Sequence, residues 1–229
     1  MDRGLYIAAS GMAAEMVRQD QIAGDLANAS TPGYKADRST QREFGAILLA
    51  DTATGQTVGV AGSGVGIDRT VTDLRPEALR DTGDPLDFGI EGEGFFVVRT
   101  PQGDRYTRAG RFQSDAQGRL TTPEGYLVLG TNGAPVSVGA GGKLDPAALR
   151  IVRLGGAAKQ GDNLFTGTPA GAPAGVVRAG MLEGSGTDPA RSMVEMIASL
   201  RAFEAGQKVI TTIDETLGKA ANNVGSLSG

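Results

Sequence analysis

The chain has 229 residues, a formal net charge of −4 and 36 glycines, with 7 phenylalanines, 4 tyrosines and no tryptophan. It contains neither cysteine nor histidine, which excludes thiolate and imidazole metal sites, cysteine nucleophiles and histidine-based catalytic triads. The charges are spread along the chain without a Lys/Arg cluster, so we expect no binding to nucleic acid. Abundant glycine with few aromatic residues predicts many turns and thin hydrophobic cores.

The N-terminal stretch, residues 2–28, has apolar residues at helical spacing. A secretory signal is one interpretation, but Asp2 interrupts the basic start that such a signal has, and no convincing cleavage site follows. We therefore predict an uncleaved amphipathic helix. No stretch of the chain approaches the roughly 20 apolar residues that span a membrane, so we expect no membrane insertion. The predicted apolar stripe consists of Leu5, Ala8, Met12, Met16, Ile22 and Leu26.

This helix is predicted to end within residues 29–33. Pro32 cannot continue a helix, and Gly33 permits the positive φ of a turn. Residues 36–80 then look irregular and extended. The glycines of residues 61–66 could suggest a phosphate-binding loop, but no Lys-Ser/Thr follows them, and a connecting loop is the simpler interpretation.

Residues 84–130 alternate short apolar runs with turn residues. Strands are predicted at residues 95–98, 105–108, 119–121 and 126–129, separated by turns at residues 101–104, 115–118 and 123–125. Turns at such short intervals indicate an antiparallel β domain. Further strands are predicted through residues 144–154 and 176–182.

The C-terminal stretch, residues 188–227, is predicted to be one long helix that begins at the Asp188-Pro189 pair. A column of apolar residues recurs at every seventh position, as in helices that pack along a partner helix. We call this the first column: Met196, Phe203, Ile210, Leu217 and Val224. A second column starts with Met193 and Leu200 and continues with Ile213, Ala220 and Leu227. Ser199 lies outside both columns, so a charge at Ser199 is predicted to do less harm than one at Ile210.

Two interpretations of this helix remain open. It could be the long helix of an ordinary α+β domain. Alternatively, its dilute second column, interrupted by Gly206, Gln207 and Asp214, suits a helix whose burial is completed by neighbouring copies of the chain.

Four strings in the chain resemble the rod and hook proteins of the bacterial flagellum. They are LYIAASGM near the start, DLANASTPGYKAD at residues 25–37, the β string of residues 85–130, and SMVEMIASLRAFEAGQKVITTIDETL at residues 192–217. Asp25 departs from the usual asparagine, and Gly186 stands where asparagine is expected before the last helix. The turn motif of the family is matched at Leu26, Ala27, Asn28, Thr31, Gly33, Tyr34 and Lys35.

The resemblance implies an α+β fold in which the N- and C-terminal helices pair as a coiled coil around an inserted antiparallel β domain. The implied domains are residues 1–35 with 187–229 for the polymerising helices, 36–80 for an extended connection, and 81–186 for the β domain. A structural subunit of the flagellar basal-body rod is implied, without an active site or cofactor. The short length and the opening MDRGLY favour the proximal rod protein over the distal one.

The resemblance also implies partners and a location. Copies of the chain would stack with other rod and hook proteins into a hollow shaft. Export would proceed through the flagellar type III apparatus without cleavage, to the basal body outside the cytoplasmic membrane.

Two alternatives belong to other functional classes. Glu91 with Glu93, or Asp84 with Asp87, could supply an acid and a base for glycoside cleavage, but carboxylates in solvated turns are far commoner than catalytic pairs. A secreted β-domain adhesin or cell-wall-binding module is the other alternative. It would need a ligand groove, whereas the strongest features of the sequence are packing helices at both ends.

Overall fold

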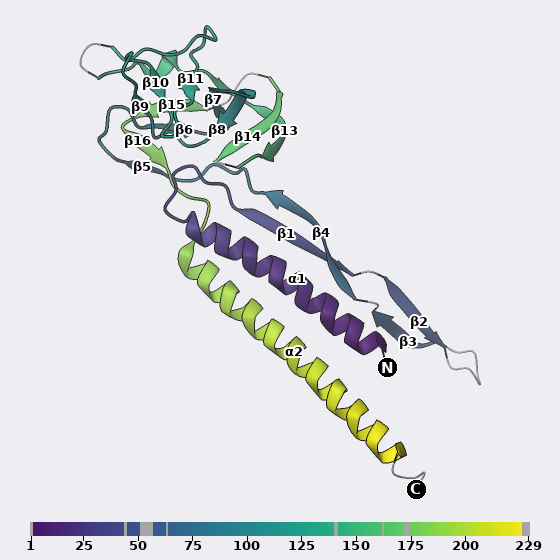
Figure 1. The fold of residues 1–229 in the computed structure, drawn as a ribbon. Coiled ribbons are helices and arrows are strands. Elements are labelled where there is room, and N and C mark those ends of the chain that lie inside the picture. Colours follow the sequence, from purple (N-terminus) through teal and green to yellow (C-terminus); the bar gives the residue numbers. More distant parts are fainter. Residues whose placement is uncertain are drawn as a thin grey trace. The chain divides into compact units, whose positions relative to one another are not determined.

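The computed structural model describes residues 2–43, 45–50, 57–62, 64–139, 142–161, 163–171 and 175–225. The chain folds into two compact units, and Figure 1 shows their elements. The helical unit comprises Met1–Leu26, Asp37–Val71 and Pro189–Gly229, and the β unit comprises Ala27–Ala36 and Thr72–Asp188. Long helices in one unit and antiparallel strands in the other make this an α+β fold. The segment expected as a separate connection over residues 36–80 is divided between the two units.

The helical unit contains two long helices. Helix α1 spans Asp2–Ala27 and helix α2 spans Pro189–Gly225, as the apolar periodicities predicted. The predicted end of the second helix, Leu227, lies outside the described residues. Neither helix has a window apolar enough to cross a membrane in the part of the chain that the structure describes.

The two helices contact each other in an antiparallel sense. The Ser199 hydroxyl lies 2.6 Å from Glu15 Oε2, and a Cβ atom at Gly206 would lie 2.8 Å from Met12 Cγ. Further along α2, Ile213 Cδ1 would lie 3.5 Å from a Cβ atom at Gly4. Residues further along α2 contact residues nearer the start of α1, so the two helices run in opposite directions. Figure 1 shows them side by side.

Paired strands occupy the rest of the helical unit. Strand β1 (Asp37–Glu43) pairs with β4 (Val65–Thr72), and β2 (Ala46–Ala50) pairs antiparallel with β3 (Thr57–Gly62). The prediction of irregular chain over residues 36–80 was therefore wrong for these strands. The Val65 N–H donates to Ser10 Oγ at 3.3 Å and the Asp37 N–H to Asp25 Oδ1 at 3.4 Å, which places the β1–β4 ribbon against α1.

The β unit is built on an eight-stranded sheet in its described residues, with strand order β13-β14-β8-β7-β11-β10-β9 and β12 added against β7. Two further antiparallel ladders join β15 to β6 and β16 to β5. The strands of the sheet are β7 (Phe95–Thr100), β8 (Gly103–Thr107), β9 (Gln113–Ser114), β10 (Leu120–Thr121), β11 (Leu127–Val128), β12 (Ile151–Val152), β13 (Leu154–Lys159) and β14 (Leu164–Pro169). The ladder strands are β5 (Leu79–Asp81), β6 (Phe88–Glu91), β15 (Val176–Ala179) and β16 (Met181–Glu183).

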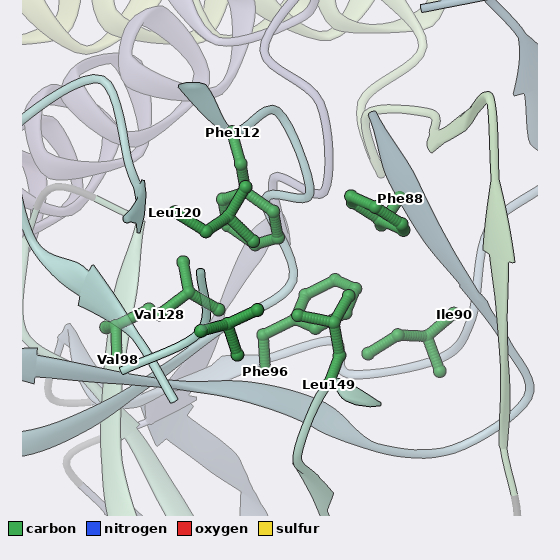
Figure 2. Packing of buried hydrophobic residues seen from close by; sticks show 9 residues of the cluster. Phe88, Ile90, Phe96, Val98, Phe112, Leu120, Val128 and Leu149 are labelled. Atoms are coloured by element: carbon green, nitrogen blue, oxygen red, sulfur yellow. The ribbon is translucent and has the colours of Figure 1, made fainter. Parts of the chain in front are cut away.

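The main core of the β unit is a cluster of aromatic and aliphatic side chains (Figure 2). The ring of Phe112 packs edge-on against Phe96, with ring centroids 5.2 Å apart. Burial of each such ring stabilises the fold by about 2 kcal/mol. The labelled side chains are Phe88, Ile90, Phe96, Val98, Phe112, Leu120, Val128 and Leu149.

The predicted strands at residues 95–98, 105–108, 119–121 and 126–129 correspond to β7, β8, β10 and β11. The prediction of continuous strand over residues 144–154 was wrong at its start. Residues Pro146–Ala148 form a 3₁₀ helix, η1, because Pro146 occupies its first turn and the Asp145 side chain accepts from the Ala147 N–H at 3.0 Å.

Candidate assembly site

The turn motif begins at the end of α1, and its residues from Ala27 onward belong to the β unit. The Asn28 carbonyl accepts hydrogen bonds from the Thr31 N–H at 3.0 Å and from the Ser185 hydroxyl at 2.9 Å. The Gly33 N–H donates to the Glu183 carbonyl at 3.0 Å. The segment that follows α1 is therefore bound directly to the segment that precedes α2.

Gly33 is required at its position for two reasons. Its φ is +65°, a backbone conformation that costs an L-residue about 1–2 kcal/mol. In addition, a Cβ atom at this position would lie 2.3 Å from the Arg108 carbonyl oxygen. The turn motif and the end of β8 thus approach each other more closely than any side chain allows.

Lys35, the last residue of the turn motif, is fully buried. Its Nζ lies 2.6 Å from Glu183 Oε1 and also donates to the Arg75 carbonyl. The second carboxylate oxygen, Glu183 Oε2, lies 3.1 Å from Arg108 Nη1, and all three charged side chains are 0–1% exposed. We call Lys35, Arg108 and Glu183 the buried junction.

Backbone groups complete the buried junction. Arg108 donates to the Ile90 carbonyl at 3.4 Å and to the Gly92 carbonyl at 2.8 Å, and its guanidinium lies 5.2 Å from the centroid of the Phe95 ring. Glu183 Oε1 also accepts from the Glu77 N–H at 2.8 Å. In this described cluster two cations share one carboxylate, so removing the carboxylate would leave two buried charges without a counter-charge.

Sequence reasoning placed Lys35 in the turn motif but did not find its two partners. Glu183 is 148 residues away in the sequence and Arg108 lies in the middle of the β string. Charged residues in a sequence are normally assigned to the surface, and nothing in their spacing indicated a buried cluster.

The two departures from the family pattern have structural explanations. Asp25 Oδ1 accepts the hydrogen bond from the Asp37 N–H, a bond for which a carboxylate serves as well as an amide. Gly186 donates its N–H to the Tyr34 carbonyl at 2.8 Å, and a Cβ atom at Gly186 would lie 3.1 Å from that oxygen. Glycine at position 186 thus lies in a close contact between two chain segments, which a side chain would crowd.

The first column of α2 lies partly buried in the helical unit at Met196, Phe203, Ile210 and Leu217, and the side chain of Val224 is outside the described set. The second column lies differently. Ile213 is partly buried, but Met193 and Leu200 are 53% and 47% exposed and Ala220 is exposed.

Three residues of α2 that meet α1, Ser199, Gly206 and Ile213, are also seven residues apart. Ser199 is only 1% exposed. It is buried in the contact with α1 although it lies outside both columns, because small and polar residues at a close helix contact give no apolar signal in the sequence.

The predicted stripe of α1 is only partly covered within one chain. Ile22 is buried, and Met12 and Leu26 are partly buried, whereas Leu5 and Met16 are exposed. Further apolar side chains are exposed on both helices: Tyr6, Ile7 and Val17 on α1, and Val194, Ile197 and Val209 on α2. An open groove of about 340 Å³ runs between α1 and β4, with Ala9, Ala13, Val65 and Ile67 in its lining. Exposed apolar surface of this extent is typical of interaction surfaces.

Comparisons with known proteins match the chain along its length. Family models match in chain order: the flagella basal body rod protein at residues 5–35, the flagellar hook protein FlgE/F/G D1 domain at 89–151, and the flagellar basal body rod FlgEFG protein C-terminal at 178–223. The flagellar basal-body rod protein FlgG of Bacillus subtilis is 33% identical, over 97% of this chain and 99% of its own length. The chain belongs to the flagellar basal-body rod protein family.

Other rod proteins match equally well. FlgF of Caulobacter vibrioides is 32% identical over the whole of both chains, and FlgF of Salmonella typhimurium is 31% identical over 96% of this rod protein and 97% of its own length. The family is structural and has no enzymatic role, so this rod protein is a structural subunit of the flagellar basal body that assembles with other rod and hook proteins. FlgG and FlgF relatives match to a similar degree, and the preference for the proximal paralogue stays a prediction.

In this rod protein, the two glutamates that could have formed a catalytic pair each form an exposed ion pair instead. Glu91 Oε2 is 2.9 Å from Arg178 Nη2, and Glu93 Oε2 is 3.2 Å from Arg153 Nε. Exposed pairs of this kind contribute about 0–1 kcal/mol. Substituting Glu91 or Glu93 by Gln is therefore expected to leave rod assembly and swimming close to normal in a motility assay. Loss of swimming by a stably folded variant would instead support a ligand-binding or catalytic role.

Proposed function

We propose that this rod protein polymerises with helical symmetry into a hollow shaft that transmits torque and lets exported subunits pass. The observation that carries the proposal is the apolar surface of both helices. Residues 193–200 of α2 are apolar on several sides, and the α1 contact covers only one of them. A helix that is apolar all round is one that becomes buried, so further copies must cover the remaining sides. Head-to-tail contacts that do not close generate filaments.

Within each subunit, we propose that α1 and α2 form an antiparallel coiled coil. The supporting pattern is the heptad spacing on α2, both in the first column and in the set Ser199, Gly206 and Ile213. Gly206 and Ser199 permit the helices to approach closely, and the Ser199–Glu15 hydrogen bond fixes their register. The contacts between subunits would then use the apolar residues that remain exposed, including Met193, Leu200, Leu5 and Met16.

Export through the flagellar type III apparatus, without cleavage, is part of the same proposal. It follows from family membership and agrees with a chain that has no cysteine and therefore no disulfides to reduce before threading. The mature protein would lie in the basal body outside the cytoplasmic membrane. N-terminal sequencing of the assembled subunit tests this: an intact α1 supports the proposal, and loss of residues within α1 contradicts it.

Electron microscopy of the concentrated protein tests polymerisation. We expect rods or tubes of uniform diameter, and a tagged copy in cells should locate to the flagellar base. The rival hypothesis of an adhesin or cell-wall-binding module predicts a monomer that binds envelope material and no polymer. The proposed assignment to the proximal rod predicts that the tagged copy lies on the cell-proximal side of the distal rod subunits.

Limited proteolysis of the monomer tests whether neighbouring copies complete the helices. Helices with uncovered apolar faces fray in isolation, whereas the sheet and buried junction protect the β unit. Protease should trim both termini and leave a resistant core that retains the β unit, near residues 27–188. Resistance of both termini in the monomer would contradict completion by neighbours.

A further inference from the structure

We infer that Glu183 is a positioning residue for assembly, which holds the chain leaving α1 and the chain entering α2 together within the β unit. The inference deepens the proposed polymerisation, on which it rests. α1 ends at Ala27, and Lys35 belongs to the segment that follows it. Glu183 ends β16, and α2 begins shortly after it at Pro189. The Lys35–Glu183 ion pair of 2.6 Å therefore joins these two segments through side chains.

Every segment by which the chain enters or leaves the β unit is bonded near this carboxylate. The unit boundaries fall after residues 26, 36, 71 and 188. The Asp73 N–H donates to the Ala36 carbonyl at 2.9 Å, and the Gly186 N–H donates to the Tyr34 carbonyl at 2.8 Å. Arg75 lies two residues after Asp73, and its carbonyl accepts from Lys35. The buried junction thus gathers the connecting segments at one place in the β unit.

The buried junction holds two cations and one carboxylate, so single and double substitutions can distinguish the role of each residue. Glu183 faces both Lys35 and Arg108, so the Lys35→Met variant leaves one cation and one carboxylate, which still form a pair. The Glu183→Gln variant leaves two buried cations without a counter-charge. The double variant removes one of those cations. Removing one partner of a buried pair is strongly destabilising, whereas apolar replacement of both partners is tolerated.

Stability and assembly are therefore expected to respond differently in the full-length chain. Glu183→Gln should lower the unfolding midpoint of the β unit by roughly 10 °C, and Lys35→Met by a few degrees at most. Adding Lys35→Met to Glu183→Gln should restore part of the lost midpoint, because it removes an unpaired buried charge. Swimming should stay reduced at least tenfold in all three variants, since each lacks the ion pair that joins the two connecting segments.

The experiment measures thermal unfolding of the purified proteins and swimming of strains that carry them, at a temperature well below each midpoint. Glu91→Gln, which alters an exposed pair, is the control and should match the unmodified protein in both assays. A folded Lys35→Met variant that swims normally would overturn the inference, as would midpoint losses that simply add in the double variant. If polymerisation itself is the wrong proposal, the pattern of unfolding midpoints should still appear. In that case the strain that carries Ile210→Asp should swim.

Discussion

Replacing Ile210 with aspartate is expected to abolish swimming while leaving secretion of the subunit unchanged. Ile210 is a partly buried member of the first column, between Phe203 and Leu217. A carboxylate placed among apolar side chains without a partner costs on the order of several kcal/mol. The same position recurs in every copy, so the penalty recurs along the shaft. The unfolded chain never uses this packing, and the amount of subunit exported should therefore stay normal.

The matched control is Thr212→Asp. Thr212 is exposed, and two residues of separation place it on the opposite side of α2 from Ile210. The charge added is the same, so any difference between the variants reports the packing face. Swimming assays and immunoblots of secreted subunit measure both effects. Normal swimming by the Ile210→Asp strain would show that this face of α2 does not build the shaft.

Ser199 is unsuitable as a mild control, although its sequence position suggested one. Its hydroxyl donates to Glu15 Oε2, and an aspartate there would bring a second carboxylate against Glu15. Hydrophobicity therefore does not separate a harmful site from a harmless one on this helix, because the buried Ser199 side chain lies in the contact with α1.

The parts of the fold that sequence predicted are those with local and repetitive signals. Both long helices follow from apolar residues that recur over many turns, and the strands of the β unit from short apolar runs between turn residues. The ribbon in which β1 pairs with β4 was missed because β1 (Asp37–Glu43) carries polar residues on both faces. Because apolar residues are absent from both faces of that strand, it shows no period-two alternation of hydrophobicity in the sequence.

The buried junction was missed for a different reason. A lysine, an arginine and a glutamate become compatible with burial only when tertiary structure brings them within hydrogen-bond distance. That condition depends on contacts between segments more than 70 residues apart, as between Arg108 and Glu183. The resemblance to the rod family marked Lys35 as part of a motif, but only the structure assigns it a partner.

Replacing Gly33 with alanine is expected to be far more damaging than the same change at Gly118. Both glycines have similar positive φ values, +65° and +74°, so each alanine should lose about 1–2 kcal/mol for its backbone conformation. At Gly118 a Cβ atom meets nothing within 4 Å. At Gly33 it would lie 2.3 Å from the Arg108 carbonyl oxygen and 2.7 Å from the Ala109 nitrogen, both rigid backbone atoms.

The turn motif must therefore move away from the residue that supplies the guanidinium of the buried junction. We expect Gly118→Ala to lower the unfolding midpoint by roughly 2–8 °C, from about 2–4 °C per kcal/mol for a chain of this size, and Gly33→Ala to lower it by several degrees more, because of the additional backbone clash. Thermal unfolding monitored by circular dichroism measures both. Swimming at a temperature where both proteins are folded should be lost for Gly33→Ala alone, because displacing the turn motif also displaces the Lys35–Glu183 pair. Equal midpoints for the two variants would mean that the turn motif can relax without disturbing the junction, and that its glycine serves only the turn.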